Sequence, residues 1–268
     1  MNTPTTDLKV TIIQTSLVWE KIDANLKWFD EKLLKIPKDS TDLIVLPEMF
    51  NTGFTMNADA FHELMNGKTM KWMLKKAKEK NAVVTGSLII KEGENYFNRL
   101  IWMQPNDKIE YYDKRHLFRI SDEHSNFTKG GNKLLVELKG WRICPMICYD
   151  LRFPVWVRNK DEYDLLLFVA NWPERRNYPW QQLLIARAIE NIAYVVGVNR
   201  IGEDGNGINH SGNSVVLDPL GMPLISTNPS LISNAEYIAT VTLSHANLEK
   251  YRSTFPFAMD RDSFTIEG

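Results

Sequence analysis

The chain has 268 residues, 44% of them hydrophobic, and its 32 Lys and Arg side chains nearly balance its 33 Asp and Glu side chains. Such a chain is long and apolar enough to bury a full core. Because its net charge is close to zero, it has no overall attraction for a phosphate backbone or an anionic membrane, and we expect neither a nucleic acid nor a membrane as partner. No apolar run approaches the roughly 18 residues that a membrane-spanning helix needs.

The two cysteines, Cys144 and Cys148, are predicted to be free thiols. They lie four residues apart in a segment typical of a strand, where about 3.3 Å per residue would separate their Cα atoms by roughly 13 Å, too far for a disulfide. Free thiols indicate a reducing compartment. The N-terminal sequence also lacks the basic and apolar regions of a signal peptide, so we expect a cytoplasmic protein.

Strand and helix patterns alternate in the first half of the chain. An apolar strand pattern, an amphipathic helix pattern and a second buried strand that stops before Pro47 form a β-α-β unit. A turn at Pro105–Asp107 separates the last two strands of this half. The predicted strands are Leu8–Gln14, Leu43–Leu46, Ala82–Ile90, Tyr96–Met103 and Ile109–Tyr112, and the predicted helices are Asp23–Leu34 and Lys68–Lys80.

The second half continues the alternation. Its predicted strands are Arg142–Cys148, Leu165–Val169, Tyr194–Asn199, Val215–Leu217 and Tyr237–Leu243, and its predicted helix is Trp180–Ile192. Gly202–Gly207 is interpreted as a loop, and the last two strands as a closing pair before a short helix and an irregular tail. Strands alternating with helices predict an α/β layered fold, and the absence of a linker or repeat favours one domain over residues 1–268.

Cys148 stands where an apolar strand gives way to a polar segment. It follows Ile143–Ile147 and precedes Tyr149–Arg152, so its thiol can emerge at the edge of a sheet, where active-site groups of α/β proteins collect. A free cysteine is more often an inert core thiol, and we keep that interpretation for Cys144.

Glu48 and Lys114 also lie just after predicted strands, Glu48 after Leu43–Leu46 and Pro47, and Lys114 after Ile109–Tyr112. A carboxylate at an apolar strand end is costly unless it has a partner or a function, whereas a lone lysine is more often part of a solvated basic cluster. Together with the Cys148 thiol, the two groups meet the needs of acyl transfer from an amide. Glu48 would be the general base, and Lys114 and the backbone N–H of Tyr149 would stabilise the oxyanion. A water activated by Glu48 would then cleave the thioester.

Three motifs around these residues resemble those of the nitrilase, or carbon–nitrogen hydrolase, superfamily, and they occur in that family's chain order. The motifs are Leu46–Phe50, Tyr112–Phe118 and Ile147–Pro154, and the similarity extends from Leu8 to about Tyr251. The resemblance implies an α-β-β-α sandwich that pairs to α-β-β-α-α-β-β-α in a homodimer, with no metal and no organic cofactor. Trp156, Trp172 and Trp180 are aromatic candidates for the interface.

The resemblance also implies a second glutamate between the lysine and the cysteine, which orients the lysine or the substrate. Glu123, in the segment Ser121–His124, is the matching candidate. Its neighbour Asp122 could take the same place, and an exposed loop carboxylate without a function is the alternative for Glu123.

Segments after the cysteine resemble the omega-amidase branch of the superfamily. They are Cys148–Trp156, Val169–Pro173 and Ala186–Asn191. Omega-amidases hydrolyse the terminal amide of 2-oxo acid monoamides such as 2-oxoglutaramate and 2-oxosuccinamate. Because these substrates carry a carboxylate, their pocket needs a cation, and the candidates are Arg175, Arg176 and Arg119, with Tyr149 and Trp172 as aromatic walls. Arg152 is closer to the cysteine in sequence, but a structural ion pair is the favoured interpretation for it.

Other functions remain as alternatives. Another amidase, a carbamoylase or a nitrilase would share the Glu48, Lys114 and Cys148 constellation, and a non-catalytic binding protein could keep the fold. Thiol–disulfide exchange usually needs a Cys-x-x-Cys motif, which is absent. The five histidines show no metal-ligand spacing, and a papain-like pair of Cys148 with His116 lacks the expected surroundings. Gly202–Gly207 fits neither a calcium loop nor a dinucleotide fingerprint.

Overall fold

The computed structural model describes residues 6–160, 162–225 and 234–266. Within these ranges the larger of two main sheets has the strand order β13-β1-β2-β3-β4-β5. β1, β2 and β3 pair in parallel, and the other neighbours are antiparallel. The strands are β1 (Leu8–Gln14), β2 (Leu43–Val45), β3 (Val83–Glu92), β4 (Asn95–Met103), β5 (Ile109–Asp113) and β13 (Tyr237–Leu243).

The second main sheet has the order β12-β9-β8-β7-β6, with β7, β8 and β9 in parallel. A separate hairpin of β10 and β11 follows β9. The strands are β6 (Val136–Leu138), β7 (Trp141–Ile147), β8 (Leu165–Ala170), β9 (Tyr194–Asn199), β10 (Ile201–Glu203), β11 (Asn209–Ser211) and β12 (Val215–Leu217).

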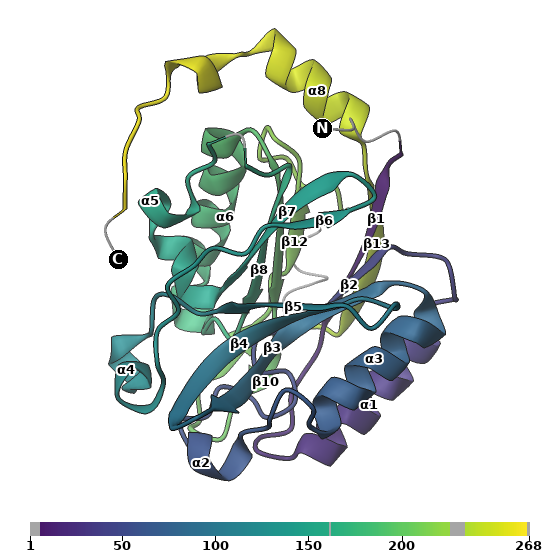
Figure 1. Cartoon of the computed structure of the whole chain (residues 1–268), viewed down its shortest axis with the longest axis vertical. Coiled ribbons are helices and arrows are strands. Elements are labelled where there is room, and N and C mark those ends of the chain that lie inside the picture. The colour runs from purple at the N-terminus through teal and green to yellow at the C-terminus, as the bar shows by residue number, and fades with distance from the viewer. Residues whose placement is uncertain (1–5, 161, 226–233, 267–268) are drawn as a thin grey trace.

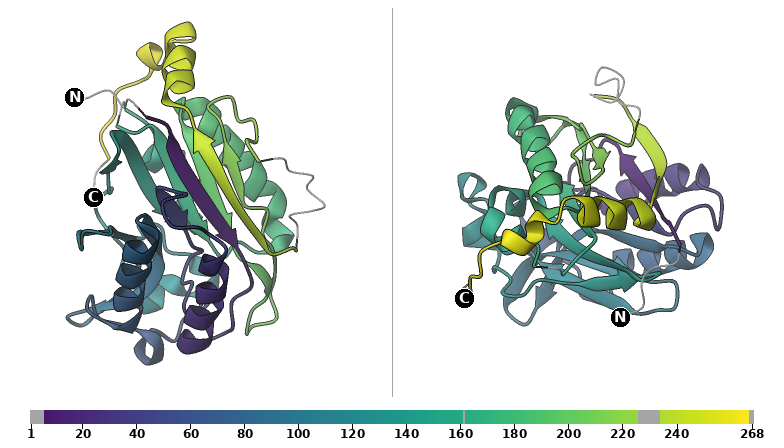
Figure 2. Two further views of the ribbon diagram at one scale, coloured as in Figure 1. Left: turned by 90° about the vertical axis from the view of Figure 1, so that its right-hand side faces the viewer. Right: turned by 90° about the horizontal axis from the view of Figure 1, so that it is seen from above.

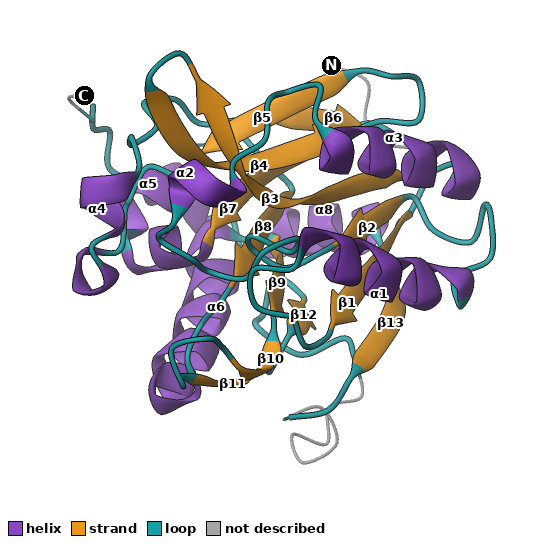
Figure 3. Cartoon of the chain, turned by 90° about the horizontal axis from the view of Figure 1, so that it is seen from below, coloured by secondary structure: helices purple, strands orange, loops and turns teal. Residues whose placement is uncertain are grey.

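Helices cover the outer faces of both sheets (Figure 1, Figure 3). α1 (Ile22–Leu34) and α3 (Lys68–Lys80) pack on the larger sheet, and α6 (Asn177–Asn191) packs on the smaller one. The shorter helices are α2 (Ala58–Phe61), α4 (Glu123–Asn126), α5 (Pro154–Val157) and α8 (His245–Thr254), and the 3-10 turns are η1 (Arg119–Ser121), η2 (Cys148–Arg152), η3 (Glu174–Arg176) and η4 (Phe257–Asp260). The predicted α-β-β-α sandwich is confirmed.

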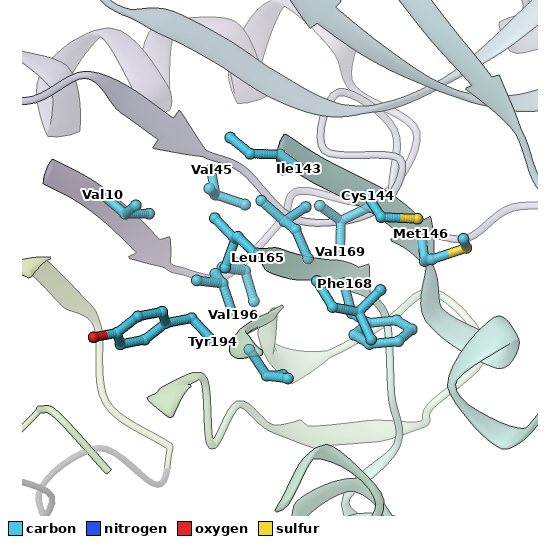
Figure 4. Close-up of a cluster of buried hydrophobic side chains, with 14 of the residues drawn as sticks. Val10, Val45, Ile143, Cys144, Met146, Leu165, Phe168, Val169, Tyr194 and Val196 are labelled. Atoms are coloured by element: carbon cyan, nitrogen blue, oxygen red, sulfur yellow. The ribbon is translucent and has the colours of Figure 1, made fainter. Parts of the chain in front are cut away.

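The main core lies between the two sheets. Figure 4 shows Val10 and Val45 of the larger sheet in one cluster with Ile143, Leu165 and Val169 of the smaller sheet. A second cluster fills the space between the larger sheet and its two helices. Because the central strands are buried on both faces, their sequences are continuous apolar runs rather than alternating ones.

The bounds of most predicted elements are confirmed within one or two residues, but one predicted pairing of strands is not. The predicted closing pair of strands is wrong, because β12 pairs with β9 of one sheet and β13 pairs with β1 of the other. Figure 2 shows β13 and β1 side by side. Each late strand extends its own sheet by a hydrogen-bonded ladder, a pairing between distant segments that local patterns do not contain.

Other differences have local causes. The interpretation of Gly202–Gly207 as a loop is wrong in part, since Gly202 and Glu203 belong to β10 and only the following residues form the turn. α6 begins at Asn177 rather than at Trp180, because Pro179 is tolerated in the first helical turn, where its missing N–H has no partner to lose.

The aromatic candidates for a subunit interface are buried inside the chain instead. Trp156, Trp172 and Trp180 are at most 7% exposed and belong to the main core. Both cysteines are free, as predicted. In the described ranges no helix has the length and apolarity to cross a membrane. Residues 1–5, which bear on the signal-peptide prediction, lie outside those ranges.

Candidate active site

Three strand ends bring Glu48, Lys114 and Cys148 together. Glu48 follows β2 after Leu46 and Pro47, Lys114 follows β5 directly, and Cys148 follows β7 directly. β2 and β7 belong to different sheets, so the site lies where the ends of the two sheets meet. Glu48 and Lys114 are completely buried, and Cys148 is 9% exposed.

Lys114 is held between two carboxylates. Its Nζ donates to Glu48 Oε1 at 2.8 Å and to both carboxylate oxygens of Glu123, at 2.9 and 3.0 Å. Glu123 begins α4 and also accepts the backbone N–H of Phe118 at 2.6 Å. The structure thus places Glu123 against the lysine, whereas the neighbouring Asp122 lies at the wall of the cavity described below.

Burial and neighbouring charges set the ionisation of these groups. Burial alone would lower the pKa of Lys114, but the carboxylates of Glu123 and Glu48 raise it above its usual value, so the ammonium stays charged. Burial raises the pKa of Glu123, and the Lys114 charge opposes that rise. Burial and the Glu48 charge raise the pKa of the Cys148 thiol well above its usual value, with Lys114 acting in the opposite direction. The raised pKa favours the protonated thiol, so a reaction in which Cys148 attacked a carbon atom would need a base.

The backbone at Cys148 is strained. Cys148 has a φ of 44°, in the left-handed region that side-chain-bearing residues rarely adopt, and Met49 next to Glu48 has a φ of 42°. Such a conformation costs on the order of 1–2 kcal/mol and persists only where surrounding contacts impose it. At Cys148 it ends β7 abruptly and begins the turn η2, which carries Tyr149 and Arg152.

A cavity of about 340 Å³ opens above the thiol. Lys114 and Cys148 line it, together with aromatic residues from several loops. Four of the predicted substrate-binding residues line it: Tyr149, Trp172, Arg175 and Arg176. Residues of the β10–β11 hairpin, including Ile208 and His210, form a further part of the wall.

Arg119 and Arg152 differ from their predicted roles. Arg119 is exposed on η1 and does not line the cavity, because the flanking Phe118 and Ile120 point there instead. The predicted ion pair of Arg152 is wrong, since among the described residues this side chain pairs with no carboxylate. Its guanidinium lies 4.9 Å from the centre of the Trp172 ring and lines the cavity.

The chain matches the family model described as carbon-nitrogen hydrolase over residues 9–252. It belongs to this family. The chain is therefore a hydrolase that acts on carbon–nitrogen bonds.

Individual relatives of this carbon–nitrogen hydrolase support the same family assignment. It is 45% identical to the omega-amidase YafV of Escherichia coli, over 97% of this chain and 98% of the relative. It is 32% identical to a 2-oxoglutaramate amidase of Bacillus subtilis, over 80% and 84% of the two chains. A solved structure of a CN-hydrolase superfamily protein from Xanthomonas campestris, which carries an arsenic adduct in its active site, is 42% identical and has a TM-score of 0.94, with coverage of 98% and 100%.

Sequence reasoning missed two asparagines that hold Glu48 in this carbon–nitrogen hydrolase. Asn98 Nδ2 donates to Glu48 Oε1 at 2.8 Å and to Glu123 Oε1 at 3.1 Å. The backbone N–H of Asn171 donates to Glu48 Oε2 at 2.8 Å, and its side chain donates to the Glu48 carbonyl oxygen at 2.6 Å. The sequence held one signal for each residue: Asn98 is polar but lies inside the apolar strand β4, and Asn171 directly follows β8.

The described residues contain no group of three or more His, Cys, Asp and Glu side chains that could hold a metal ion.

Proposed function

We propose that this chain is an omega-amidase that hydrolyses the terminal amide of 2-oxo acid monoamides such as 2-oxoglutaramate and 2-oxosuccinamate. One observation carries the proposal. Three guanidinium groups, those of Arg152, Arg175 and Arg176, line the cavity above Cys148, and none forms an ion pair with a carboxylate of the described chain. An unpaired cationic group of this kind suits a substrate with a free carboxylate. The similarity to relatives named omega-amidase and 2-oxoglutaramate amidase supports it.

In the acylation step, the thiol proton of Cys148 moves to Glu48 as the sulfur attacks the amide carbon. The carbonyl oxygen becomes an oxyanion, stabilised by the Lys114 ammonium and the backbone N–H of Tyr149. Glu48 returns the proton to the amide nitrogen, the carbon–nitrogen bond breaks, and ammonia leaves. The product is a thioester on Cys148.

In the deacylation step, Glu48 removes a proton from a water molecule, which attacks the thioester carbon. The Lys114 ammonium and the backbone N–H of Tyr149 also stabilise the second oxyanion. When the carbon–sulfur bond breaks, Glu48 returns its proton to the Cys148 sulfur. The new carboxylic acid keeps the second proton of the water, loses it to solvent, and leaves as the dicarboxylate. Asn98 and Asn171 hold the Glu48 carboxylate in one orientation through both steps, because Asn98 binds one of its oxygens and Asn171 binds the other.

Arg152 and Arg176 are the best-placed partners for the substrate carboxylate. Both are half-buried, one against the ring of Trp172 and the other 5.0 Å from the centre of the Phe118 ring. Burial and the nearby charge of Arg175 lower the pKa of Arg176, so an anion in the cavity would relieve repulsion between like charges. Arg175 is exposed, and solvent weakens its contribution.

Replacing these arginines by methionine tests the proposal. For Arg152→Met and Arg176→Met we expect kcat/KM on succinamate to fall by roughly 2–5 kcal/mol of transition-state stabilisation, because a carboxylate would enter a site with less compensating charge. Turnover of butyramide, an uncharged amide of similar length, should barely change. For Arg175→Met we expect a smaller fall in kcat/KM on succinamate. Arg119→Met is the matched control, since Arg119 does not line the cavity.

Steady-state kinetics on both substrates distinguishes the outcomes. Equal losses on succinamate and butyramide would make the arginine structural. A wild-type enzyme that does not prefer the charged substrate would remove the omega-amidase assignment and leave a generic amidase, carbamoylase or nitrilase.

We also propose a homodimer. α5 and α6 expose large apolar side chains on the outside of the smaller sheet's helical layer, among them Val155 at 55%, Tyr178 at 74% and Ile189 at 44% exposure. Burying these groups between two copies would remove apolar area from water. Light scattering at micromolar concentration should give about twice the 31.0 kDa of one chain. A mass of one chain would contradict the dimer.

A cytoplasmic location is proposed on the same basis as before, namely two free thiols. One domain over residues 1–268 is likewise a proposal, supported by the family match over residues 9–252.

A further inference from the structure

The carboxylate of Asp150 is completely buried two residues after Cys148, and it accepts four hydrogen bonds. Oδ1 accepts the backbone N–H of His116 at 3.0 Å and lies 2.7 Å from the Nδ1 atom of the same residue. Oδ2 accepts the Tyr112 hydroxyl at 2.8 Å and the backbone N–H of Ile147 at 3.1 Å. A buried carboxylate is tolerated only with such a full set of partners.

The partners come from the two segments that carry the candidate catalytic groups. Tyr112 and His116 flank Lys114, each two residues away, and Ile147 immediately precedes Cys148. The Tyr112 hydroxyl is itself fixed, because it accepts the Trp156 indole N–H at 3.1 Å. A single side chain therefore joins the lysine's segment to the nucleophile's turn.

We propose that Asp150 is a positioning residue that sets the Cys148 thiol against Lys114 and Glu48. The inference rests on the function proposed above, in which Cys148 is the nucleophile. The left-handed backbone at Cys148 needs contacts that impose it, and the bond from Ile147 N–H to Asp150 closes the turn around that residue. Charge-assisted hydrogen bonds are the stronger kind, which suits them to hold a strained turn.

A different side chain anchors the far end of the same turn. Arg187, which is 4% exposed, donates from Nε and Nη2 to the Leu151 carbonyl oxygen at 3.1 and 2.7 Å. The neighbouring Arg152 is therefore held independently of the Asp150 carboxylate. Loss of Asp150 should disturb the reacting groups more than the binding of the substrate carboxylate.

Asp150→Asn is the informative variant, because its amide nitrogen cannot accept a hydrogen bond. Whichever way the amide turns, at least one N–H donor of Ile147 or His116, or the Tyr112 hydroxyl, loses its acceptor. We expect kcat on succinamate to fall about 100-fold, the size of effect that a misplacement of about 1 Å can cause, while KM stays within about fivefold. Alkylation of Cys148 by iodoacetamide, followed by peptide mass spectrometry, should slow at least about tenfold.

Asp164→Asn is the matched control. Asp164 is also a buried carboxylate, 1% exposed, and it is held by Arg142 and Arg252 directly before β8, at the opposite end of that strand from Asn171. Its loss should lower the melting temperature and leave kcat and the alkylation rate of Cys148 near wild type. Both variants are assayed well below their melting temperatures, with near-UV circular dichroism to show that they are folded.

If Asp150→Asn does not fold, His116→Ala decides instead, because it removes one ring contact to Asp150 and keeps the carboxylate. A fall in kcat of about threefold or more, as expected for one lost hydrogen bond, supports the proposal. Unchanged kcat would overturn it.

The positioning role would be overturned if Asp150→Asn kept the wild-type kcat and alkylation rate. It would also be overturned if kcat and the alkylation rate fell no further in Asp150→Asn than in Asp164→Asn. The alkylation comparison does not depend on turnover of any amide. If the wild-type enzyme hydrolysed none of the tested amides, the proposed function would fail while the labelling rates still decided the role of Asp150.

Discussion

Cys148→Ala is expected to abolish amide hydrolysis while the protein stays folded, whereas Cys144→Ala keeps its activity. Cys148 lines the cavity at a strand end, so losing its sulfur would remove the proposed nucleophile and little packing. Cys144 is completely buried in the core between the sheets (Figure 4), where burial raises the pKa of its thiol to about 12. We expect a loss in kcat of about 10⁴-fold or more at Cys148.

Ammonia release, with circular dichroism as the check on folding, measures both variants under the same conditions. A thiol probe adds a second test, because Cys148 in the cavity should label faster than Cys144. Equal loss of activity in both folded variants would refute Cys148 as the nucleophile. Labelling of Cys148 no faster than Cys144 would favour a non-catalytic protein with this fold.

The second large effect is expected for Glu48→Gln. One carboxylate would serve thiol activation, ammonia departure and thioester hydrolysis, so its loss should exceed the roughly 10²–10⁴-fold of a single general acid–base step. Removing the Glu48 charge takes away one cause of the raised pKa of the Cys148 thiol, but burial, the largest cause, remains and opposes formation of a thiolate without a base. The glutamine amide would also meet N–H donors from Lys114, Asn98 or Asn171, and one of these would lose its acceptor.

Glu63→Gln is a matched control for that variant. Glu63 is a half-buried glutamate that accepts hydrogen bonds from Asn51 and Thr69 and does not line the cavity. The Glu63→Gln variant should be less stable than the wild type and should hydrolyse amides at the wild-type rate. If Glu48→Gln kept more than about a tenth of the wild-type rate, another residue would have to be the base.

Strand ends explain why much of the site could be predicted from the sequence. A buried strand is a short apolar run, so the residue that follows it is visible, and Glu48 and Cys148 both follow such runs. Lys114 follows the partly exposed strand β5, whose sequence IEYYD is not an apolar run, so there the family motif was the stronger signal. Runs of this kind also located β1 and β9 to the residue. The side-chain contacts of Lys114 needed coordinates, because its partners come from segments far apart in the chain.

Residues within turns could not be assigned in this way. Arg119 and Arg152 both lie in 3-10 turns near the cavity, yet only Arg152 lines it, because the direction of each side chain depends on the path of its turn. Asn98 was missed for a different reason. It occupies the middle of β4, where alternation shows which face a residue is on but not that a carboxylate approaches that face.

Ammonia release from a panel of amides tests the central claim most directly. The panel contains 2-oxoglutaramate, succinamate, glutamine, asparagine, butyramide and a nitrile, each assayed with the wild-type enzyme and with Cys148→Ala as the blank. The account predicts the highest kcat/KM on 2-oxoglutaramate, lower turnover of succinamate, and little on the uncharged amide or the nitrile. Faster hydrolysis of butyramide or the nitrile than of 2-oxoglutaramate would contradict it.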